Sequence, residues 1–339
     1  MSCSVERTLN DLVAVTGGDG FIGSHLVEAL VARGARVRAM AQYNAFGTWG
    51  WLDALPANVL ESVEVVLGDV RDARSVHELM HGAASVYHLA ALIAIPYSYS
   101  APRSYLDTNA IGTLNVLEAA RELETPRVVH TSTSEVYGTA QTVPISESHP
   151  LHAQSPYAAS KIAGDKLAES YHRSFGVPVV TLRPFNTYGP RQSARAVIPT
   201  VITQLAAGER ELRLGLLTPT RDFNYVADTV EAFLAVGTAP DAAVVGRVLN
   251  AGSGTETSIA DVAHMIAEII GVEPSITEEQ VRLRPDDSEV MRLVSDATAL
   301  RDATGWAPRV SLRDGLVATC SWFREPSNLA RYRSDRFVV

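Results

Sequence analysis

The chain has 339 residues and a formal net charge of −9, with 46% hydrophobic and 20% charged residues. This composition is typical of a globular protein that forms one large domain or two closely packed ones. The negative charge argues against nucleic acid as a partner, although a few local arginines could still hold a polyanionic ligand. The only cysteines, Cys3 and Cys320, lack metal-ligand spacing, so the sequence indicates neither a disulfide framework nor a metal site.

No apolar run is long enough for a transmembrane helix, and residues 1–7 lack the apolar core of a secretory signal. We therefore expect a cytoplasmic protein without a membrane partner.

The first expected element is an apolar strand at residues 12–16, and a glycine-rich turn follows it. The spaced glycines of this turn are Gly17, Gly20 and Gly23. They permit a tight turn, a close approach of the backbone to a pyrophosphate, and close helix–strand packing. A helix that starts with Phe21 and Ile22 and stops at Gly34 would direct its first amides at the phosphates. The pattern predicts dinucleotide binding.

The second strand, residues 36–41, ends without the acidic residue that usually holds the adenosine ribose of NAD. Arg36 and Arg38 lie nearby, but neither clearly replaces that acid with a site for a 2′-phosphate. We expect NAD as the cofactor, and NADP is not excluded. The aromatic segment 43–53 either covers the cofactor or packs on the sheet edge, and we favour packing.

Strands at 63–67 and 84–89 both lead into expected cofactor contacts. These contacts are Asp69 and Val70 after the first strand, and Leu89, Ala90 and Ala91 at the end of the second. Asp69 either accepts a hydrogen bond from the adenine amino group or caps the helix that starts near Ala73. A long helix is expected at 102–123, in which Asn109 braces neighbouring backbone.

The stretch from Val128 to Lys161 holds the expected catalytic residues. An apolar strand near 128–131 ends in Thr133, Ser134 and Glu135, and Ser155 and Pro156 then start a helix. On this helix Tyr157 and Lys161 are one turn apart and share a face. An ammonium beside a phenol should lower the phenol pKa, which makes Tyr157 a general base for a substrate hydroxyl. An isolated match of this kind more often marks a half-buried ring under a solvated ammonium; the upstream Thr133 and the glycine turn favour the catalytic interpretation.

A further strand at 177–182 leads to Asn186 and Arg191, after which the strand–helix alternation loosens. Helices are expected at 196–207, 227–236 and 258–270, and strands at 211–216 and 247–250. Three arginines in proline-rich loops are candidates for a substrate diphosphate, although each alone is most simply a surface charge. They are Arg191, Arg221 and Arg284.

Strands alternating with helices predict an α/β fold with a doubly wound parallel (Rossmann) sheet and a smaller C-terminal α/β substrate domain. We assign residues 1–190 and about 220–252 to the dinucleotide-binding domain. We assign 191–219 and 253–339 to the substrate domain. Ligands in such sheets lie beyond the carboxyl ends of the strands.

Together these residues resemble the extended short-chain dehydrogenases/reductases of the NAD-dependent epimerase/dehydratase family, over nearly the whole chain. The matching positions are the three glycines, Asp69, His88 to Ala91, Asn109, Thr133, Tyr157, Lys161, Arg183, Pro184 and Asn186. The resemblance implies NAD chemistry at C4 of a nucleotide-diphosphate sugar, with Thr133, Tyr157 and Lys161 as the catalytic triad. It also implies a homodimer formed through helices 102–123 and 155–175.

Within this family, Glu135 occupies the position of the glutamate base of sugar 4,6-dehydratases. Ser134 stands where thymidine-linked glucose dehydratases place an aspartate, so the pattern is more similar to GDP-mannose 4,6-dehydratase. The segments 43–53 and 190–199 resemble N-acetylglucosamine-nucleotide 4,6-dehydratases of bacterial nonulosonic-acid pathways, such as legionaminic acid synthesis.

The resemblance implies a 4,6-dehydratase that oxidises C4, removes the C5 proton with Glu135, eliminates water and returns hydride to C6. With Ser134 in place of the aspartate, Glu135 itself or a water must protonate the C6 hydroxyl. Alternatives on the same fold are a UDP-glucuronate decarboxylase and a nucleotide-sugar 4-epimerase, which use the same C4 oxidation. An oxidoreductase that releases reduced cofactor and a non-catalytic nucleotide-binding protein are further alternatives.

Overall fold

The computed structural model describes residues 11–333, and a seven-stranded parallel sheet forms its centre. The sheet order is β11-β6-β5-β4-β1-β2-β3. The strands are β1 (Leu12–Thr16), β2 (Arg36–Gln42), β3 (Val63–Gly68), β4 (Ser85–His88), β5 (Val128–Thr131), β6 (Val179–Pro184) and β11 (Val248–Ala251). The order reverses between β1 and β4, which is the switch point of a Rossmann sheet. The predicted fold class is confirmed.

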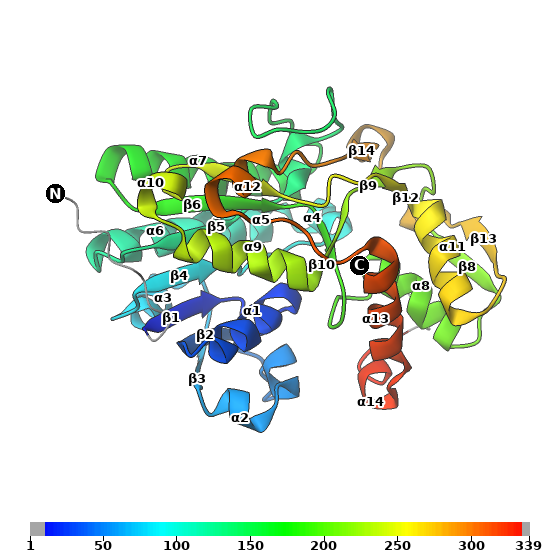
Figure 1. The fold of residues 1–339 in the computed structure, drawn as a ribbon, viewed down its shortest axis with the longest axis horizontal. Helices are drawn as coiled ribbons and strands as arrows, with labels where there is room; N and C mark the ends of the chain where they lie inside the picture. Colours follow the sequence, from blue (N-terminus) through cyan, green and yellow to red (C-terminus); the bar gives the residue numbers. More distant parts are fainter. Residues whose placement is uncertain (1–10, 334–339) are drawn as a thin grey trace.

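Helices cover both faces of this sheet (Figure 1). One face carries α1 (Phe21–Ala32), α9 (Val226–Thr238) and α12 (Thr298–Thr304); the other carries α3 (Ala73–Met80), α6 (Gly112–Glu122) and α7 (Pro156–Phe175). The central strands are rich in Val, Leu and Ala, as expected for strands with both faces buried, whereas the edge strand β3 is partly exposed. Each layer therefore has its own apolar core.

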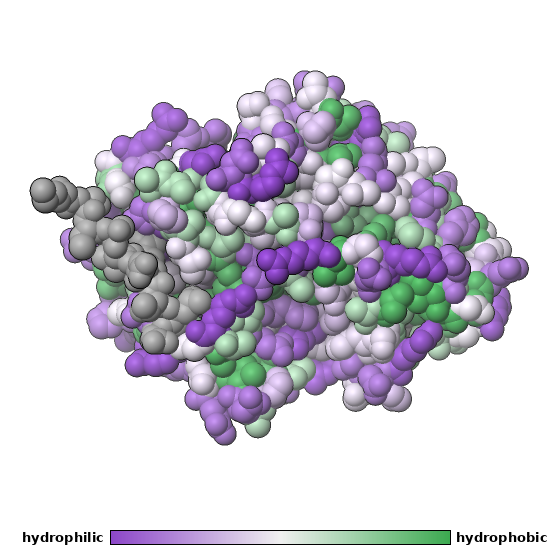
Figure 2. All heavy atoms as spheres, viewed as in Figure 1, coloured by the Kyte–Doolittle hydropathy of each residue, from purple (hydrophilic) through white to green (hydrophobic). Residues whose placement is uncertain are grey.

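A smaller lobe lies at the right of Figure 1 and has a separate core. Its main elements are α8 (Val197–Ala206), β8 (Glu211–Leu214), α11 (Ile259–Ile270), β13 (Ser275–Glu278) and α13 (Leu312–Arg324). In Figure 2, hydrophilic and apolar residues are interspersed over the visible face, and an apolar patch lies over this lobe.

The remaining elements are short. They are η1 (Gly50–Ala54), α2 (Ala57–Leu60), α4 (Ile95–Ser100), α5 (Pro102–Tyr105), η2 (Leu106–Ile111), η3 (Ser134–Tyr137), β7 (Asn186–Tyr188), β9 (Thr220–Arg221), β10 (Phe223–Tyr225), α10 (Asp241–Val244), β12 (Thr257–Ser258), η4 (Gln280–Arg282), η5 (Asp286–Ser288), β14 (Arg292–Leu293) and α14 (Pro326–Leu329). Strand β7 pairs in parallel with β10, and β9 lies between β12 and β14.

The predicted elements agree with the structure within a few residues, with one clear exception. The expected helix at 102–123 is divided into α5, a π-helical turn (η2) and α6. Asn109 lies in the π turn, where its side chain accepts the N–H of Leu92 at 2.8 Å and donates to Ser160 at 2.9 Å. The expected bracing role of Asn109 is therefore confirmed.

The C-terminal part of the chain contributes to both cores. Leu300 and Trp306 are buried with the residues of α1 and α9, because α12 packs beside β11. Within the expected substrate segment 253–339, α12 packs on the Rossmann sheet, whereas α11, β13 and α13 lie in the smaller lobe, and the boundary at 253 stays a prediction. The other domain boundaries stay predictions.

The aromatic segment 43–53 packs only in part, as η1. Trp51 lies edge-on to Trp322, with ring centroids 5.7 Å apart, and Tyr332 lies 6.0 Å away. Tyr43 and Phe46, by contrast, are largely exposed.

Cys320 is buried, and Cys3 lies outside the described residues. No helix within residues 11–333 combines the length and the apolar character needed to cross a membrane.

Candidate active site

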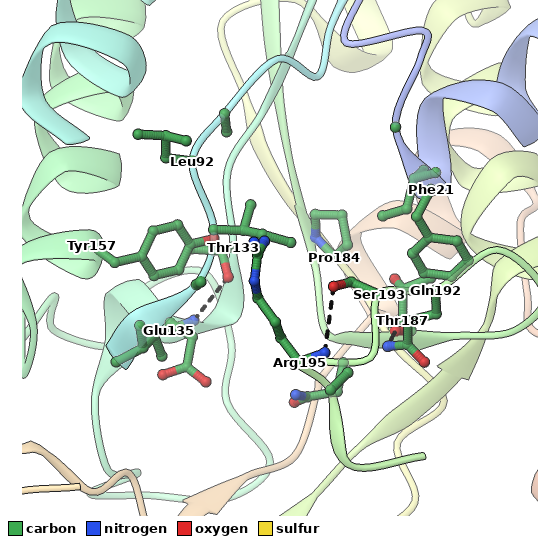
Figure 3. A pocket seen from close by; sticks show the side chains of 18 of the residues that line it. Phe21, Leu92, Thr133, Glu135, Tyr157, Pro184, Thr187, Gln192, Ser193 and Arg195 are labelled. Carbon is green, nitrogen blue, oxygen red and sulfur yellow. Dashed lines mark hydrogen bonds between the residues drawn. The ribbon is translucent and has the colours of Figure 1, made fainter. Parts of the chain in front are cut away.

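A cavity of about 770 Å³ lies at the carboxyl ends of β1, β4, β5 and β6, facing the smaller lobe. It is lined by the glycine turn, by the ends of these strands and by loops of the smaller lobe. All sequence-predicted site residues except Arg191 line it. Figure 3 shows the side chains of Tyr157, Thr133 and Glu135 on one side of this cavity and Phe21 on the other.

The glycine turn can be built only from glycine at two of its positions. Gly17 has φ +68°, and a Cβ on it would lie 2.7 Å from the backbone nitrogen of Ala90. A Cβ on Gly23 would lie 1.9 Å from the Gly17 carbonyl oxygen. These contacts pack the turn against β4 and α1, so backbone rather than side chains faces the cavity.

The start of α1 suits a phosphate ligand. The N-cap residue is Gly20, which has no side chain to cap the helix, and Phe21 and Ile22 line the cavity. The first amides of a helix lack intrahelical partners and carry the positive end of its dipole. The Thr16 hydroxyl accepts the N–H groups of Leu89 and Ala90, each at 3.1 Å, which fixes the end of β4 beside the turn. The donors present therefore fit the pyrophosphate of a dinucleotide.

The adenosine end of the groove contains a carboxylate that sequence spacing does not place there. Asp19 lines the cavity and accepts the backbone N–H of Gln42, at the end of β2, at 3.0 Å. Burial raises the pKa of Asp19, while the hydrogen bond from Gln42 opposes the increase. Arg38 points elsewhere: it pairs with Glu64 at 2.8 Å and donates to carbonyls at the end of α3.

Asp69 and Val70 line the same groove. The Asp69 carboxylate forms an ion pair with Arg71 at 2.5 Å, whose hydrogen bond lowers the pKa of Asp69. The cap of α3 is Asp72, which accepts the N–H of Arg74 at 3.0 Å. Asp69 is therefore not the helix cap, which leaves the adenine contact as its expected role.

The end of β5 presents three candidate catalytic side chains. Thr133 caps η3, and its hydroxyl accepts the Glu135 N–H at 3.3 Å. Ser134 is buried with 2% exposure, and Glu135 lines the cavity. Because the turn is short and capped, Thr133 and Glu135 reach the cavity from adjacent backbone (Figure 3).

Tyr157 enters the cavity from the first turn of α7. Ser155 caps this helix by accepting the Ala158 N–H at 3.1 Å, and Pro156 occupies the first turn. The Tyr157 ring packs edge-on against Tyr105, and its hydroxyl points toward Thr133.

The expected lowering of the Tyr157 pKa is wrong. Burial raises the pKa of Tyr157, the Thr133 hydrogen bond opposes this, and the Glu135 charge adds to the increase. The Lys161 ammonium donates to the Thr131 carbonyl at 2.6 Å, and its proximity does not overcome the effect of Tyr157 burial. Burial lowers the pKa of Lys161 itself to about 8, against the opposing charge of Asp165.

On the substrate side of the cavity, two arginines form ion pairs with the same carboxylate. Arg221 and Arg284 lie 3.2 Å and 3.5 Å from the same Glu289 oxygen, and all three residues line the cavity. Burial lowers the pKa of Arg221, while the charges of Glu135 and Glu289 oppose the shift. The Oδ1 atom of Asn186 is buried without a hydrogen-bond partner among residues 11–333. The two guanidinium groups suit an anionic ligand, and the Asn186 acceptor suits a hydroxyl donor.

Arg191 is not brought to this site. Its guanidinium pairs with Glu28 of α1 at 2.9 Å and lies outside the cavity lining. Arg195, which the sequence did not single out, points into the cavity from the same loop, toward Thr133 and Tyr157 (Figure 3).

Three residues of the site were missed by sequence reasoning: Asp19, Glu289 and Arg195. Asp19 lies inside the glycine motif and the other two lie in loops whose path depends on the smaller lobe. A signal existed only for Arg195, since it follows Arg191 in the same polar loop.

Comparisons with known proteins agree with this geometry. The family model described as GDP-mannose 4,6 dehydratase matches residues 14–319. A dTDP-glucose 4,6-dehydratase of Streptomyces niveus is 34% identical over 320 residues, covering 92% of this chain and 93% of the relative. A UDP-glucose 4-epimerase of Mycolicibacterium smegmatis is 34% identical over 319 residues, covering 92% and 98%.

Among solved structures, a DesIV double mutant, a dTDP-glucose 4,6-dehydratase from Streptomyces venezuelae with NAD bound, has a TM-score of 0.84 and 30% identity. The match covers 94% of this chain and 98% of that one. The chain therefore belongs to the extended short-chain dehydrogenase/reductase family of NAD-dependent epimerases and dehydratases, with similarity to nucleotide-sugar 4,6-dehydratases.

Proposed function

We propose that this protein is a nucleotide-diphosphate-sugar 4,6-dehydratase that forms a 4-keto-6-deoxy sugar. The observation that carries the proposal is the position of Glu135, which lines one cavity with Thr133, Tyr157 and Lys161. C4 oxidation alone needs the other three residues, whereas elimination across C5 and C6 needs an additional base. Glu135 supplies a carboxylate on the side of the cavity where the reacting sugar carbons would lie.

We propose NAD as the cofactor. When bound, it supplies a hydride acceptor for C4 and returns the hydride to C6. The glycine turn and the start of α1 would hold its pyrophosphate. Support for NAD over NADP comes from Asp19, whose charge would repel a 2′-phosphate, and from Arg38, which is engaged by Glu64.

Tyr157 would act as the base in its phenolate form, which the Lys161 ammonium would stabilise, and would become a neutral phenol when it accepts the proton of the C4 hydroxyl. Since burial raises the pKa of Tyr157, this transfer depends on positive charge close to the phenol. Thr133 would donate its hydroxyl to the O4 atom as that atom gains ketone character.

Glu135 would then remove the C5 proton, which the 4-ketone makes acidic. Ser134 is buried beside it and cannot supply a carboxylic acid proton. We therefore propose that protonated Glu135 returns its proton to the departing C6 hydroxyl, directly or through water. On the substrate side, Arg221 and Arg284 would bind the diphosphate, and the Asn186 Oδ1 atom would accept a hydrogen bond from a sugar hydroxyl.

The substrate class we favour is a nucleotide-linked N-acetylglucosamine or hexose, by the resemblance of segments 43–53 and 190–199. The test is a panel of nucleotide sugars, with products analysed by mass spectrometry. Loss of water identifies a dehydratase, loss of carbon dioxide identifies a decarboxylase, and an unchanged mass with altered configuration identifies a 4-epimerase. Only the first outcome supports the proposal.

Glu135→Gln separates the two halves of the reaction. This variant should still reduce NAD when substrate is added, but it should form no 4-keto-6-deoxy product. The matched control is Glu61→Gln, an exposed glutamate outside the cavity, which should keep full activity. Normal product formation by Glu135→Gln would remove the basis of the proposal.

We further propose a homodimer formed through the segments 102–123 and 155–175. Leu106 and Ile111 support this, since each is 45% exposed on the π turn within the first segment. Sedimentation measurements would test it.

A further inference from the structure

Asp165 is a buried carboxylate on the same face of α7 as the two expected catalytic residues. Tyr157, Lys161 and Asp165 follow one another at successive helical turns and are 7%, 4% and 5% exposed. The proposed reaction gives Asp165 no role, and it does not line the cavity. A buried carboxylate needs several partners to remain charged, so the contacts of Asp165 indicate what role it has.

The partners of Asp165 come from two neighbouring strands. Ser132 and Arg183 each donate to its Oδ2 atom at 2.8 Å, and Arg183 adds a second bond through Nε at 3.1 Å. His130 lies 3.2 Å from the Oδ1 atom. Burial would raise the pKa of Asp165, but the His130 hydrogen bond and the Arg183 charge lower it to about 2. Asp165 is therefore ionised throughout the neutral range.

One of these contacts and a neighbouring hydrogen bond of Lys161 fix the geometry of the active site. Ser132 immediately precedes Thr133, so its bond to Asp165 ties the end of β5 to α7, which carries Tyr157. Lys161 adds a second tie between the same elements through the Thr131 carbonyl. The general base and the residue that faces O4 are thus held at a fixed separation.

Most of the titratable groups around Lys161 do not favour its charged form. The titratable groups on the elements packed around it are His88 of β4, His130 of β5, Arg183 of β6, Tyr105 of α5, Tyr157 and Asp165 of α7, and Glu135 of η3. Burial lowers the pKa of both histidines, so they are neutral, and the Tyr157 phenol is protonated. Asp165 is the one carboxylate among these groups that acts on Lys161 to favour its charged form.

We propose that Asp165 is a positioning residue that serves as the counter-charge of Lys161 and joins α7 to the strand end bearing Thr133. Its role in catalysis rests on the proposed function, because it acts on C4 oxidation through Lys161. A charged Lys161 favours the Tyr157 phenolate, whereas a neutral amine leaves the buried phenol protonated. The charge of Asp165 itself raises the pKa of Tyr157, so its contribution to the proton transfer is the positive charge that it keeps on Lys161.

The sequence offers a direct test, because the chain contains two lysines, Lys161 and Lys166. Protein labelled with 13C at the lysine ε carbon gives two NMR signals, and the exposed Lys166 is the internal reference. The wild-type Lys161 signal should titrate with a midpoint near pH 8. In Asp165→Asn the midpoint should fall by at least about one pH unit, since a neighbouring charge typically shifts a pKa by 1–3 units.

Ser132→Ala is the matched control, since it removes one hydrogen bond of Asp165 and leaves its charge. The Lys161 midpoint of this variant should stay at the wild-type value. An unchanged midpoint in Asp165→Asn would overturn the proposal. So would a wild-type Lys161 that is uncharged at pH 7, a result that needs no variant.

Asp165→Asn leaves Arg183 buried without its anion, and such a variant can fail to fold. The double variant Asp165→Asn/Arg183→Gln removes both charges and should show the same lowered Lys161 midpoint. Folding of each variant is checked by circular dichroism before the titration.

A kinetic measurement connects the titration to catalysis. Between pH 6.5 and pH 8, the rate of NAD reduction by substrate should fall about fourfold more in Asp165→Asn than in the wild type if the Lys161 midpoint is one pH unit lower. A purely structural role would lower the rate equally at both pH values.

C4 oxidation is common to dehydratases, decarboxylases and epimerases, and the NMR titration needs no substrate. Failure of the proposed dehydration would appear in the product mass and would leave this test intact.

Discussion

The carboxylate of Asp19 accepts the backbone N–H of Gln42 at 3.0 Å, which brings a negative charge to the end of β2. The sequence has no acidic residue at the end of β2. Asp19 of the glycine turn places a carboxylate there because the turn lies beside this strand end in the folded structure. Both residues line the groove proposed for the adenosine half of NAD.

Asp19→Asn should therefore weaken the discrimination between NAD and NADP. Removing the charge that faces the ribose should raise NADP affinity relative to NAD by about tenfold, which corresponds to ~1.4 kcal/mol. Fluorescence titration with each dinucleotide measures the ratio. Arg38→Gln is the control, and it should leave NADP binding unchanged because Glu64 engages Arg38. An unaltered NAD/NADP ratio in Asp19→Asn would refute the assignment.

Arg221→Gln should weaken binding of a nucleoside diphosphate. Charge-assisted hydrogen bonds are worth about 1.5–3 kcal/mol, so the dissociation constant should rise by about 10- to 100-fold in calorimetry. Arg292 pairs with Glu256 at 2.6 Å outside the cavity, and Arg292→Gln should bind normally. Equal losses in the two variants would point to a general charge effect instead of a diphosphate site.

Tyr157→Phe should lower turnover by about 10²–10⁴-fold, the usual weight of a positioned acid–base group. Dinucleotide affinity should change little, because the substitution removes only the hydroxyl. Tyr105→Phe is a matched control, since its hydroxyl donates to the Ala94 carbonyl and Tyr105 does not line the cavity. A loss below tenfold in Tyr157→Phe would argue against its role as the base.

The stability of the protein should depend on Asp165 in the acid range. The folded-state pKa of Asp165, about 2, is below the ordinary value of 3.8. The carboxylate therefore stabilises the folded state fully above pH 3.8, and this contribution is lost as the pH falls toward 2. The contribution amounts to ~2 kcal/mol, since one pKa unit corresponds to 1.36 kcal/mol.

Urea unfolding of the wild type and of Asp165→Asn measures this effect. The difference in unfolding free energy between them should be constant from pH 7 to pH 5 and should shrink below pH 4. A difference that grows as the pH falls would show that Asp165 is not stabilised as a carboxylate.

The sheet and the glycine turn could be predicted because short-range rules determine them. Gly17 and Gly23 are required by backbone contacts within one strand–turn–helix unit, and the strands are recognisable as apolar runs. The same holds for the start of α7, where the cap Ser155, Pro156 and Tyr157 are neighbours in sequence.

Features that depend on distant partners could not be predicted. The π turn interrupts an apolar pattern that reads as one helix, because Asn109 is held by Leu92 and Ser160 from other segments. The expected direction of the Tyr157 pKa shift was wrong because helical spacing gives the position of Lys161 but not the burial of the Tyr157 ring, which raises its pKa. Arg191 and Arg195 lie in one loop, and only the folded path of that loop shows which one enters the cavity.

The packing of Trp51 against Trp322 and Tyr332 has a consequence for how the protein is made. Tyr332 also donates its hydroxyl to the Gln192 carbonyl at 2.9 Å, on the loop that carries Arg195 into the cavity. A ribosome-bound chain that has not yet emerged past Tyr332 therefore lacks the support for this loop. We expect the nascent chain to form its Rossmann sheet first and to complete the wall of the substrate cavity only after Tyr332 has emerged from the ribosome.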